Sequence, residues 1–184
     1  MGSTRIETER LVLRDWREQD WAPFFAGTNT STVMRWLGGV MDAEKMEWQR
    51  VRLEQYAADH GHTFWPVERK QDGMIIGFCG LKLSNQPGGP HGDFEIGWRL
   101  RDDAWGQGFA REAAMASLEY AFSVLNAPHV LAFTVTGNTP SWGLMERLGM
   151  ARRSDLDFDS GEFDPEAGRI IVYAITRQAW VAAQ

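Results

Sequence analysis

An alternating stretch in the middle of the chain is the clearest strand signal in the sequence. Residues 94–101 place apolar and charged or small side chains on opposite faces, as a strand with two different environments does. One face holds Phe94, Ile96, Trp98 and Leu100, and the other holds Glu95, Gly97, Arg99 and Arg101. We therefore expect a strand with one face in an apolar core and the other face in a polar environment.

Other segments follow the same two periodicities. Short apolar or alternating runs predict strands at residues 10–14, 62–70, 74–83, 129–136, 150–158 and 169–176. Helical spacing and end signals predict helices at residues 18–26, 42–58, about 110–126 and 138–148. The first helix requires Pro23 to lie in its first turn, and Asp42 is the expected N-cap of the second. Asp72-Gly73 predicts a tight turn between two of the strands.

The order of these elements indicates a fold class. Strands and helices mix without the regular alternation of a doubly wound sheet, so we expect a mixed α+β sheet flanked by helices. The sequence contains no internal repeat, low-complexity tract or long linker, and we expect residues 1–184 to form a single domain.

Composition excludes several classes of protein. Apolar residues make up 43% and charged residues 24%, which are globular values. A net charge of −6 without a basic run disfavours nucleic acid as a partner. The single cysteine, Cys79, allows no internal disulfide, and an apolar run of membrane-spanning length is missing. We expect a cytoplasmic protein without a membrane partner, and the sequence leaves a homodimer open.

The segment that follows the alternating strand has the composition of an anion site. Trp105-Gly106-Gln107-Gly108-Phe109-Ala110 leads from the strand into a predicted helix. A helix start offers backbone N–H groups without helical partners and a partial positive charge, and glycine lets an anion approach the backbone. The alternative is that Gly106 and Gly108 only form a tight turn. The chain lacks GxxxxGK[ST] and a complete GxGxxG, which argues against a P-loop and a dinucleotide site.

A family resemblance appears at this point. The segments 95–100 and 105–113 resemble the coenzyme A signature of GNAT acetyltransferases, and most closely the branch of the ribosomal-protein alanine N-acetyltransferases. Residues 8–14 resemble the opening strand of that branch. Residues 138–141 with 146–150 resemble its later helix, and residues 171–177 with Trp180 resemble its end. The similar segments run through nearly the whole chain in the expected order.

The resemblance implies a fold, a reaction and a binding site. It implies a mostly antiparallel sheet in which one parallel pair of strands splays apart, with acetyl-coenzyme A as acyl donor and an amine as acceptor. Separately from the resemblance, His60, His62, His91 and His129 show no metal-ligand spacing with a second cluster, so we expect no metal. The implied coenzyme-binding residues are Trp98, Arg99, Leu100, Trp105, Gly106, Gln107, Gly108, Phe109, Ala110, Asn138 and Ser141. The family pattern often has Arg or Gln where this chain has Trp105, so we expect Trp105 to contribute its backbone N–H.

The resemblance also implies a direct attack of the amine on the thioester, for which a base must remove a proton. Glu95 is our candidate base, and a sheet carboxylate paired with Arg99 is the alternative interpretation. Ser141 is our candidate for hydrogen bonding the departing thiolate, because the predicted helix at 138–148 has no tyrosine; the alternative is that it only supports the helix start. Asn138 suits either a helix cap or a coenzyme contact.

Three further questions remain open at this stage. The acids of residues 155–166 approach the pattern of a calcium loop, but Ser160 stands where that loop needs glycine, and strand alternation explains the spacing better. The missing tyrosine also keeps open a catalytically silent acyl-coenzyme A sensor. Trp36, Trp48 and Trp65 are either core residues or part of an acceptor pocket.

Overall fold

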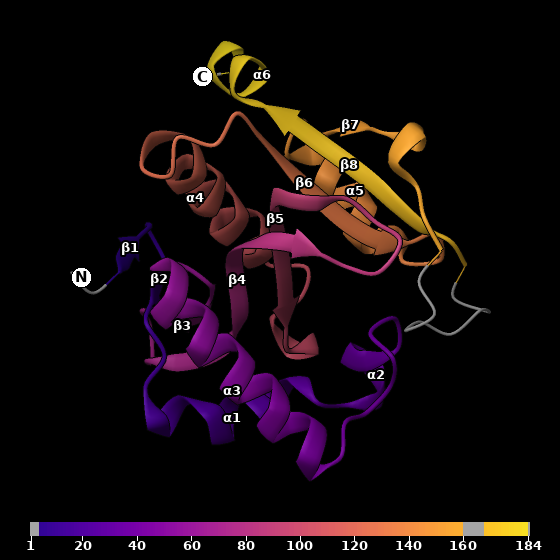
Figure 1. The fold of residues 1–184 in the computed structure, drawn as a ribbon. Helices are drawn as coiled ribbons and strands as arrows, with labels where there is room; N and C mark the ends of the chain where they lie inside the picture. Colours follow the sequence, from indigo (N-terminus) through magenta and orange to yellow (C-terminus); the bar gives the residue numbers. More distant parts are fainter. Residues whose placement is uncertain (1–3, 160–167, 184) are drawn as a thin grey trace.

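A computed structural model describes residues 4–159 and 168–183, which form a single mixed sheet with helices on both faces (Figure 1). The strand order is β1-β2-β3-β4-β5-β6-β8-β7, and every neighbouring pair is antiparallel except β5 and β6. The strands are β1 (Arg5–Glu7), β2 (Leu11–Arg14), β3 (Phe64–Arg69), β4 (Met74–Asn85), β5 (His91–Leu100), β6 (His129–Val135), β7 (Ala151–Arg152) and β8 (Ile170–Thr176). This topology confirms the predicted α+β class with one parallel pair.

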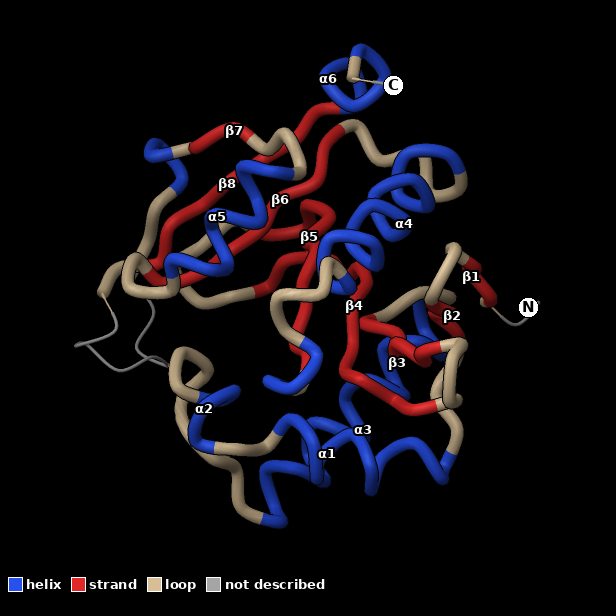
Figure 2. The backbone as a smooth tube through the Cα atoms, turned by 180° about the vertical axis from the view of Figure 1, so that it is seen from behind, coloured by secondary structure: helices blue, strands red, loops and turns tan. Residues whose placement is uncertain are grey.

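Helices cover the sheet on two sides. The α-helices are α1 (Trp21–Thr28), α2 (Ser31–Met34), α3 (Ala43–His60), α4 (Phe109–Ser123), α5 (Thr139–Arg147) and α6 (Arg177–Ala182), and the short 3-10 helices are η1 (Glu18–Asp20), η2 (Asp102–Ala104) and η3 (Ser154–Leu156). Viewed from the opposite sides in Figures 1 and 2, α3 crosses one face of the sheet, and α4 and α5 lie on the other.

Strand β5 separates two different cores. Its residues Ile96 and Leu100 are buried with α4, in the cluster that also contains Leu118. The opposite face of the neighbouring strand β4 packs Phe78 against Phe24 of α1, in a second cluster with residues of α1 and α3. The alternation predicted for residues 94–101 therefore decides which side chains meet α4 and which meet the N-terminal helices.

Local signals placed most elements correctly. The Asp42 side chain accepts a hydrogen bond from the Lys45 N–H and caps α3 as predicted. Pro23 is in the first turn of α1, where its missing N–H is tolerated. Gly73 has φ +71°, as the turn between β3 and β4 requires.

The predicted strand at residues 150–158 is wrong for most of its length. Only Ala151–Arg152 forms a strand, and the chain then turns through η3 before Phe158 makes an isolated bridge with Ile170. Ion pairs from Arg152 to Asp157 and from Arg153 to Asp155 stabilise this turn, so its acids contact arginines. Residues 160–166 of the calcium-loop alternative lie outside the described part of the chain.

Within residues 4–159 and 168–183, none of the helices combines the length and the apolar character that crossing a membrane requires.

Candidate active site

The start of α4 has the geometry of an anion cradle. Gly106 has φ +72° and Gly108, the N-cap residue, has φ +81°, both in the left-handed region that favours glycine. The Glu112 N–H donates to the Gly108 carbonyl at 3.0 Å, so the N–H groups of residues 109–111 have no partner within the helix. A Cβ placed on Gly106 would meet no atom within 4 Å, which leaves open space above this turn. The cradle can therefore offer several backbone donors to a diphosphate.

An ion pair between distant parts of the sequence holds this cradle in place. The Glu112 carboxylate accepts hydrogen bonds from the Thr8 hydroxyl at 2.6 Å, the Arg10 N–H at 2.8 Å and the Arg10 Nε at 2.7 Å. Arg10 also donates from Nη1 to the Gln107 carbonyl at 3.0 Å and stacks over the Phe109 ring. Burial alone would raise the pKa of Glu112, but these hydrogen bonds lower it overall. Arg10 and Glu112 both belong to segments that resemble the GNAT family. Because they are 102 residues apart, the sequence gave no sign that they contact each other.

The structure corrects the expectation for Trp105. Its backbone N–H donates to the Asp102 carbonyl at 3.1 Å and ends η2, so this N–H is already used. Its indole Nε1 donates to the Leu100 carbonyl at 2.9 Å. Trp105 therefore fixes the turn between β5 and α4, and the cradle consists of the residues that follow it.

The parallel strands β5 and β6 separate beside the cradle. Pairing between them is recorded at one position, Glu95 with Leu131, although β5 continues to Leu100. The Arg101 N–H donates to Ile76 on the β4 side, and N–H directions alternate along a strand. The N–H groups of Trp98 and Leu100 therefore point toward the β6 side, where the strands have separated. This gap has the backbone donors that an extended pantetheine arm could use as an added strand.

Arg99 lies apart from the cradle. Its side chain is 4% exposed and lies over the Phe24 and Phe78 rings on the side of α1, opposite to α4. The alternative interpretation of Glu95 as a paired sheet carboxylate named Arg99 as the partner, but the ion pair of Glu95 is with Lys82 at 3.5 Å. Of the predicted coenzyme contacts, Arg99 is thus the one whose side chain the structure places on the other face of the sheet.

Glu95 is buried, as is common for a catalytic acid or base whose pKa is shifted by its surroundings. It is 6% exposed, and its Oε2 has no hydrogen-bond partner within the described residues. Burial raises the pKa of Glu95 above its ordinary value, and the nearby Lys82 charge opposes this shift in part. Because Glu95 is also the position at which β5 and β6 are last paired, its carboxylate lies beside the gap between the strands.

The start of α5 brings the last two predicted residues to the end of β6. Asn138 is the N-cap residue, but its side chain makes no capping hydrogen bond, so a purely capping role does not account for it. Its carbonyl accepts a hydrogen bond from the backbone N–H of the half-buried Ser141 at 3.1 Å. Both residues come shortly after the end of β6, and β6 is the strand that forms the second side of the gap.

Three tryptophans considered for an acceptor pocket have different surroundings. Trp65 is 0% exposed and packs edge-on against Tyr120, which makes it a core residue. Trp48 is 61% exposed on α3 with Arg52 stacked on its ring. Trp36 packs against the cluster of β6 and β8 that includes Phe158.

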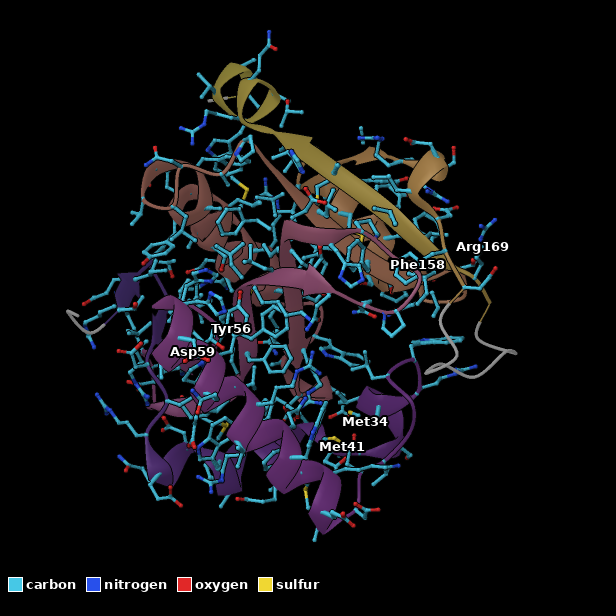
Figure 3. All side chains as sticks on the ribbon, viewed as in Figure 1. Met34, Met41, Tyr56, Asp59, Phe158 and Arg169 are labelled. Atoms are coloured by element: carbon cyan, nitrogen blue, oxygen red, sulfur yellow. The ribbon has the colours of Figure 1, made fainter. Side chains whose placement is uncertain are left out.

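Phe158, which is labelled in Figure 3 near the loop between β4 and β5, would contact a Cβ placed on Gly89. Trp36 and Phe158 thus border the face opposite to α4.

Among the described residues, we find no group of three or more histidine, cysteine, aspartate or glutamate side chains able to hold a metal ion. The site offers backbone N–H donors for phosphate binding, and a carboxylate and a hydroxyl for proton transfer and hydrogen bonding.

Comparison with known proteins identifies the family of this site. The model of the acetyltransferase (GNAT) domain family matches residues 10–151, which include the cradle, the gap and Ser141. An uncharacterized N-acetyltransferase of Bacillus subtilis, YnaD, is 30% identical over 148 residues, covering 80% of this chain and 82% of its own.

Solved structures agree with this match. A GNAT-family acetyltransferase from Bacillus anthracis has a TM-score of 0.76 at 25% identity, with 95% of this chain and 99% of that chain covered. The ribosomal-protein-S5-alanine acetyltransferase of Vibrio fischeri shares the fold with a TM-score of 0.73 at 17% identity, covering 96% and 98% of the two chains. The separated parallel strands, the amide cradle and the family match together show that this chain belongs to the GNAT acetyltransferases.

Proposed function

We propose that the protein transfers the acetyl group of acetyl-coenzyme A to a primary amine by direct attack within a ternary complex. The observation that carries this proposal is the end of β5–β6 pairing at Glu95, which leaves the Trp98 and Leu100 N–H groups in line with the free amides of α4. In this assignment residues 107–110 hold the diphosphate, and Trp98 and Leu100 hold the pantetheine arm.

Glu95 is the base in this proposal. The amine must lose a proton for the new carbon–nitrogen bond to form, and a carboxylate with a raised pKa accepts that proton more readily at neutral pH. A backbone N–H of β5 stabilises the negative charge that develops on the acetyl oxygen, because it is already oriented before the reaction. The acetyl–sulfur bond breaks as the carbon–nitrogen bond forms, and the coenzyme departs as a thiolate.

Ser141 donates a hydrogen bond to this thiolate. Its position at the start of α5, beside the end of β6, supports the assignment, and α5 has no tyrosine that could take the role. Asn138 contacts the coenzyme in the same assignment, since its side chain is not used as a cap.

The acceptor belongs to the amines of protein N-termini, amino acids or other small molecules. The name of the Vibrio fischeri structure, a ribosomal-protein-S5-alanine acetyltransferase, supports including peptides with N-terminal alanine. The net charge of −6 is compatible with a cationic amine, and we place the reaction in the cytoplasm without nucleic acid or membrane partners.

A thiol-release assay with acetyl-coenzyme A and a panel of amines and N-terminal peptides tests the proposal. We expect thiol release that depends on at least one amine, with the acetylated amine identified by mass spectrometry. Coenzyme binding without transfer to any amine would contradict it and favour the alternative, a silent acyl-coenzyme A sensor, for which the absence of a tyrosine on α5 is the supporting observation.

A further inference from the structure

Arg99 is buried on the face of β5 that is turned away from the coenzyme cradle. Its guanidinium lies 4.8 Å from the centre of the Phe24 ring and 5.0 Å from that of Phe78. Its Nη2 donates to the Gln49 side-chain oxygen at 2.7 Å, and its Nη1 contacts the Met34 sulfur at 3.3 Å. Met34, labelled in Figure 3, extends from α2 beside the first half of α3. Three helices thus enclose this charge, and none of them supplies an acid.

The charge of Arg99 is not neutralised within the described residues. No carboxylate of residues 4–159 or 168–183 lies within ion-pair distance, and within the same part of the chain the buried Nε has no hydrogen-bond partner. The other buried arginine, Arg14, is 6% exposed and contacts Asp20 at 2.6 Å and Glu68 at 2.8 Å. Burial lowers the pKa of Arg99 to about 9, so it remains charged at neutral pH. A buried charge without a counter-ion is strongly unfavourable, and Arg14 illustrates the usual solution.

The Met34 sulfur is a poor substitute for an anion. A thioether is a weak acceptor, whereas a carboxylate can accept two parallel N–H bonds from a guanidinium. The free Nε and the adjacent Nη2 provide such a pair of donors once the Gln49 side chain moves aside, and Nη1 becomes a further donor when it gives up its contact with the Met34 sulfur. The site is thus prepared for a planar anion that the described chain itself does not provide.

The anion is not a phosphate of the coenzyme. The cradle at the start of α4 lies on the opposite side of the sheet from the Arg99 side chain. Arg99 instead shares its face with Glu95, on the other side of Gly97 along β5. An acceptor whose amine reaches Glu95 would therefore extend toward Arg99.

We propose that the amine acceptor also carries a carboxylate, and that Arg99 binds this carboxylate while the amine lies beside Glu95. This inference rests on the proposed acetyl transfer. Residues four apart in a strand are separated by about 13 Å, which limits the distance between amine and carboxylate. Since an extended peptide spans about 3.5 Å per residue, the acceptor class is amino acids and peptides of up to about four residues with a free carboxyl end.

Matched pairs of acceptors test this assignment with the full chain. Alanine and alanine peptides of two, three and four residues are each assayed as the free acid and as the C-terminal amide. We expect at least one length at which the parent protein prefers the acid by about tenfold or more in kcat/KM, mainly through KM, because a charge-assisted pair at a buried site is lost in the amide.

The variant Arg99→Met should abolish this preference while keeping kcat/KM for the amide within about threefold, since methionine fills the site without charge. Arg99→Lys should keep part of the preference, and it serves as a second test if Arg99→Met does not fold in a thermal unfolding experiment. Arg50→Met is the matched control, because it removes a positive charge from α3 without touching Arg99, and its preference should equal that of the parent.

The outcomes separate this inference from the proposed function. Transfer to acid and amide with equal kcat/KM at every length would overturn the role of Arg99 and leave acetyl transfer in place. A preference for the acid that persists in Arg99→Met would also overturn it. Coenzyme binding without transfer to any acceptor would overturn the proposed function and, with it, this inference.

Discussion

The two faces of β5 differ in how they can bind a ligand. On the face of α4, Ile96 and Leu100 are packed into an apolar core, and the candidate coenzyme donors are backbone N–H groups at the strand edge and the helix start. On the opposite face, Glu95 and Arg99 are buried charged side chains that do not pair with each other: Glu95 has its ion pair with Lys82, and Arg99 has no acidic partner among the described residues. A backbone site depends on chain conformation, while a side-chain site depends on particular residues. The comparison indicates that the backbone of one strand can bind the acyl donor, while the side chains on its other face determine which amine acceptor binds.

The largest effect on coenzyme binding should come from Gly108→Asp. Aspartate at φ +81° places a negative charge in the cradle, where it repels a diphosphate and blocks its approach. We expect coenzyme A affinity, measured by calorimetry, to fall by about a hundredfold or more.

Gly73→Asp is the matched control, because Gly73 has φ +71° and lies in the turn between β3 and β4, away from the cradle. Its coenzyme affinity should be unchanged. Equal affinities in Gly108→Asp and the parent would place the diphosphate elsewhere.

Glu95→Gln tests the acceptor side. We expect kcat to fall by about a hundredfold to a thousandfold with coenzyme affinity unchanged, because the amine loses its base. Since burial raises the pKa of Glu95, the ionised fraction increases as pH rises above the ordinary value of 4.5, and kcat/KM of the parent should rise across this range. In the Glu95→Gln variant, kcat/KM should not show this rise with pH. An identical profile in both proteins would remove Glu95 as the base.

The same substitution makes a prediction for stability. A carboxyl whose pKa is raised by folding binds its proton more tightly in the folded state, so its contribution to stability decreases as pH rises from the ordinary value through the raised one. Because glutamine does not ionise, Glu95→Gln removes this pH-dependent loss of stability. The variant should therefore be at least as stable as the parent in urea unfolding at neutral pH, and a marked loss of stability would show that the ionised carboxylate supports the fold.

Ser141→Ala should have an intermediate effect, about tenfold on kcat with a smaller change in coenzyme affinity, because one hydrogen bond to the leaving thiolate is lost. Steady-state kinetics and calorimetry measure the two quantities separately. Ser123→Ala is the control, since its hydroxyl donates to the Glu119 carbonyl at the far end of α4. Unchanged turnover in Ser141→Ala would exclude Ser141 from the mechanism.

Arg10→Met should produce the smallest effect, a loss of coenzyme affinity of about threefold to tenfold, because Arg10 only supports the cradle and is half exposed. Glu112→Gln should weaken binding similarly, and the double variant should add little to either single one. Additive losses would mean that the two residues act independently. Arg5→Met, which breaks an exposed pair with Glu7, is the control.

Regular periodicity explains most of the successful predictions from sequence. The alternation of residues 94–101, the Asp42 cap of α3 and the turn at Gly73 depend on neighbours in the chain, which is why these elements were placed correctly. The predicted strand at 150–158 failed because arginine–aspartate pairs stabilise a turn there in place of a ladder. The backbone N–H of Trp105 was misassigned because a 3-10 turn, which alternation does not reveal, uses it.

The sequence by itself determined the mixed sheet, the glycine-rich start of α4 and the opposite faces of β5, because these follow from local backbone preferences and side-chain spacing. The tertiary structure alone decided where β5 and β6 part, which residues hold the cradle and which charges remain unpaired. Glu112 meets Arg10 across 102 residues, and Arg99 is buried without an acid because three separate helices close over it. Contacts of this kind depend on packing between distant segments, and packing is not encoded in any single stretch of the chain.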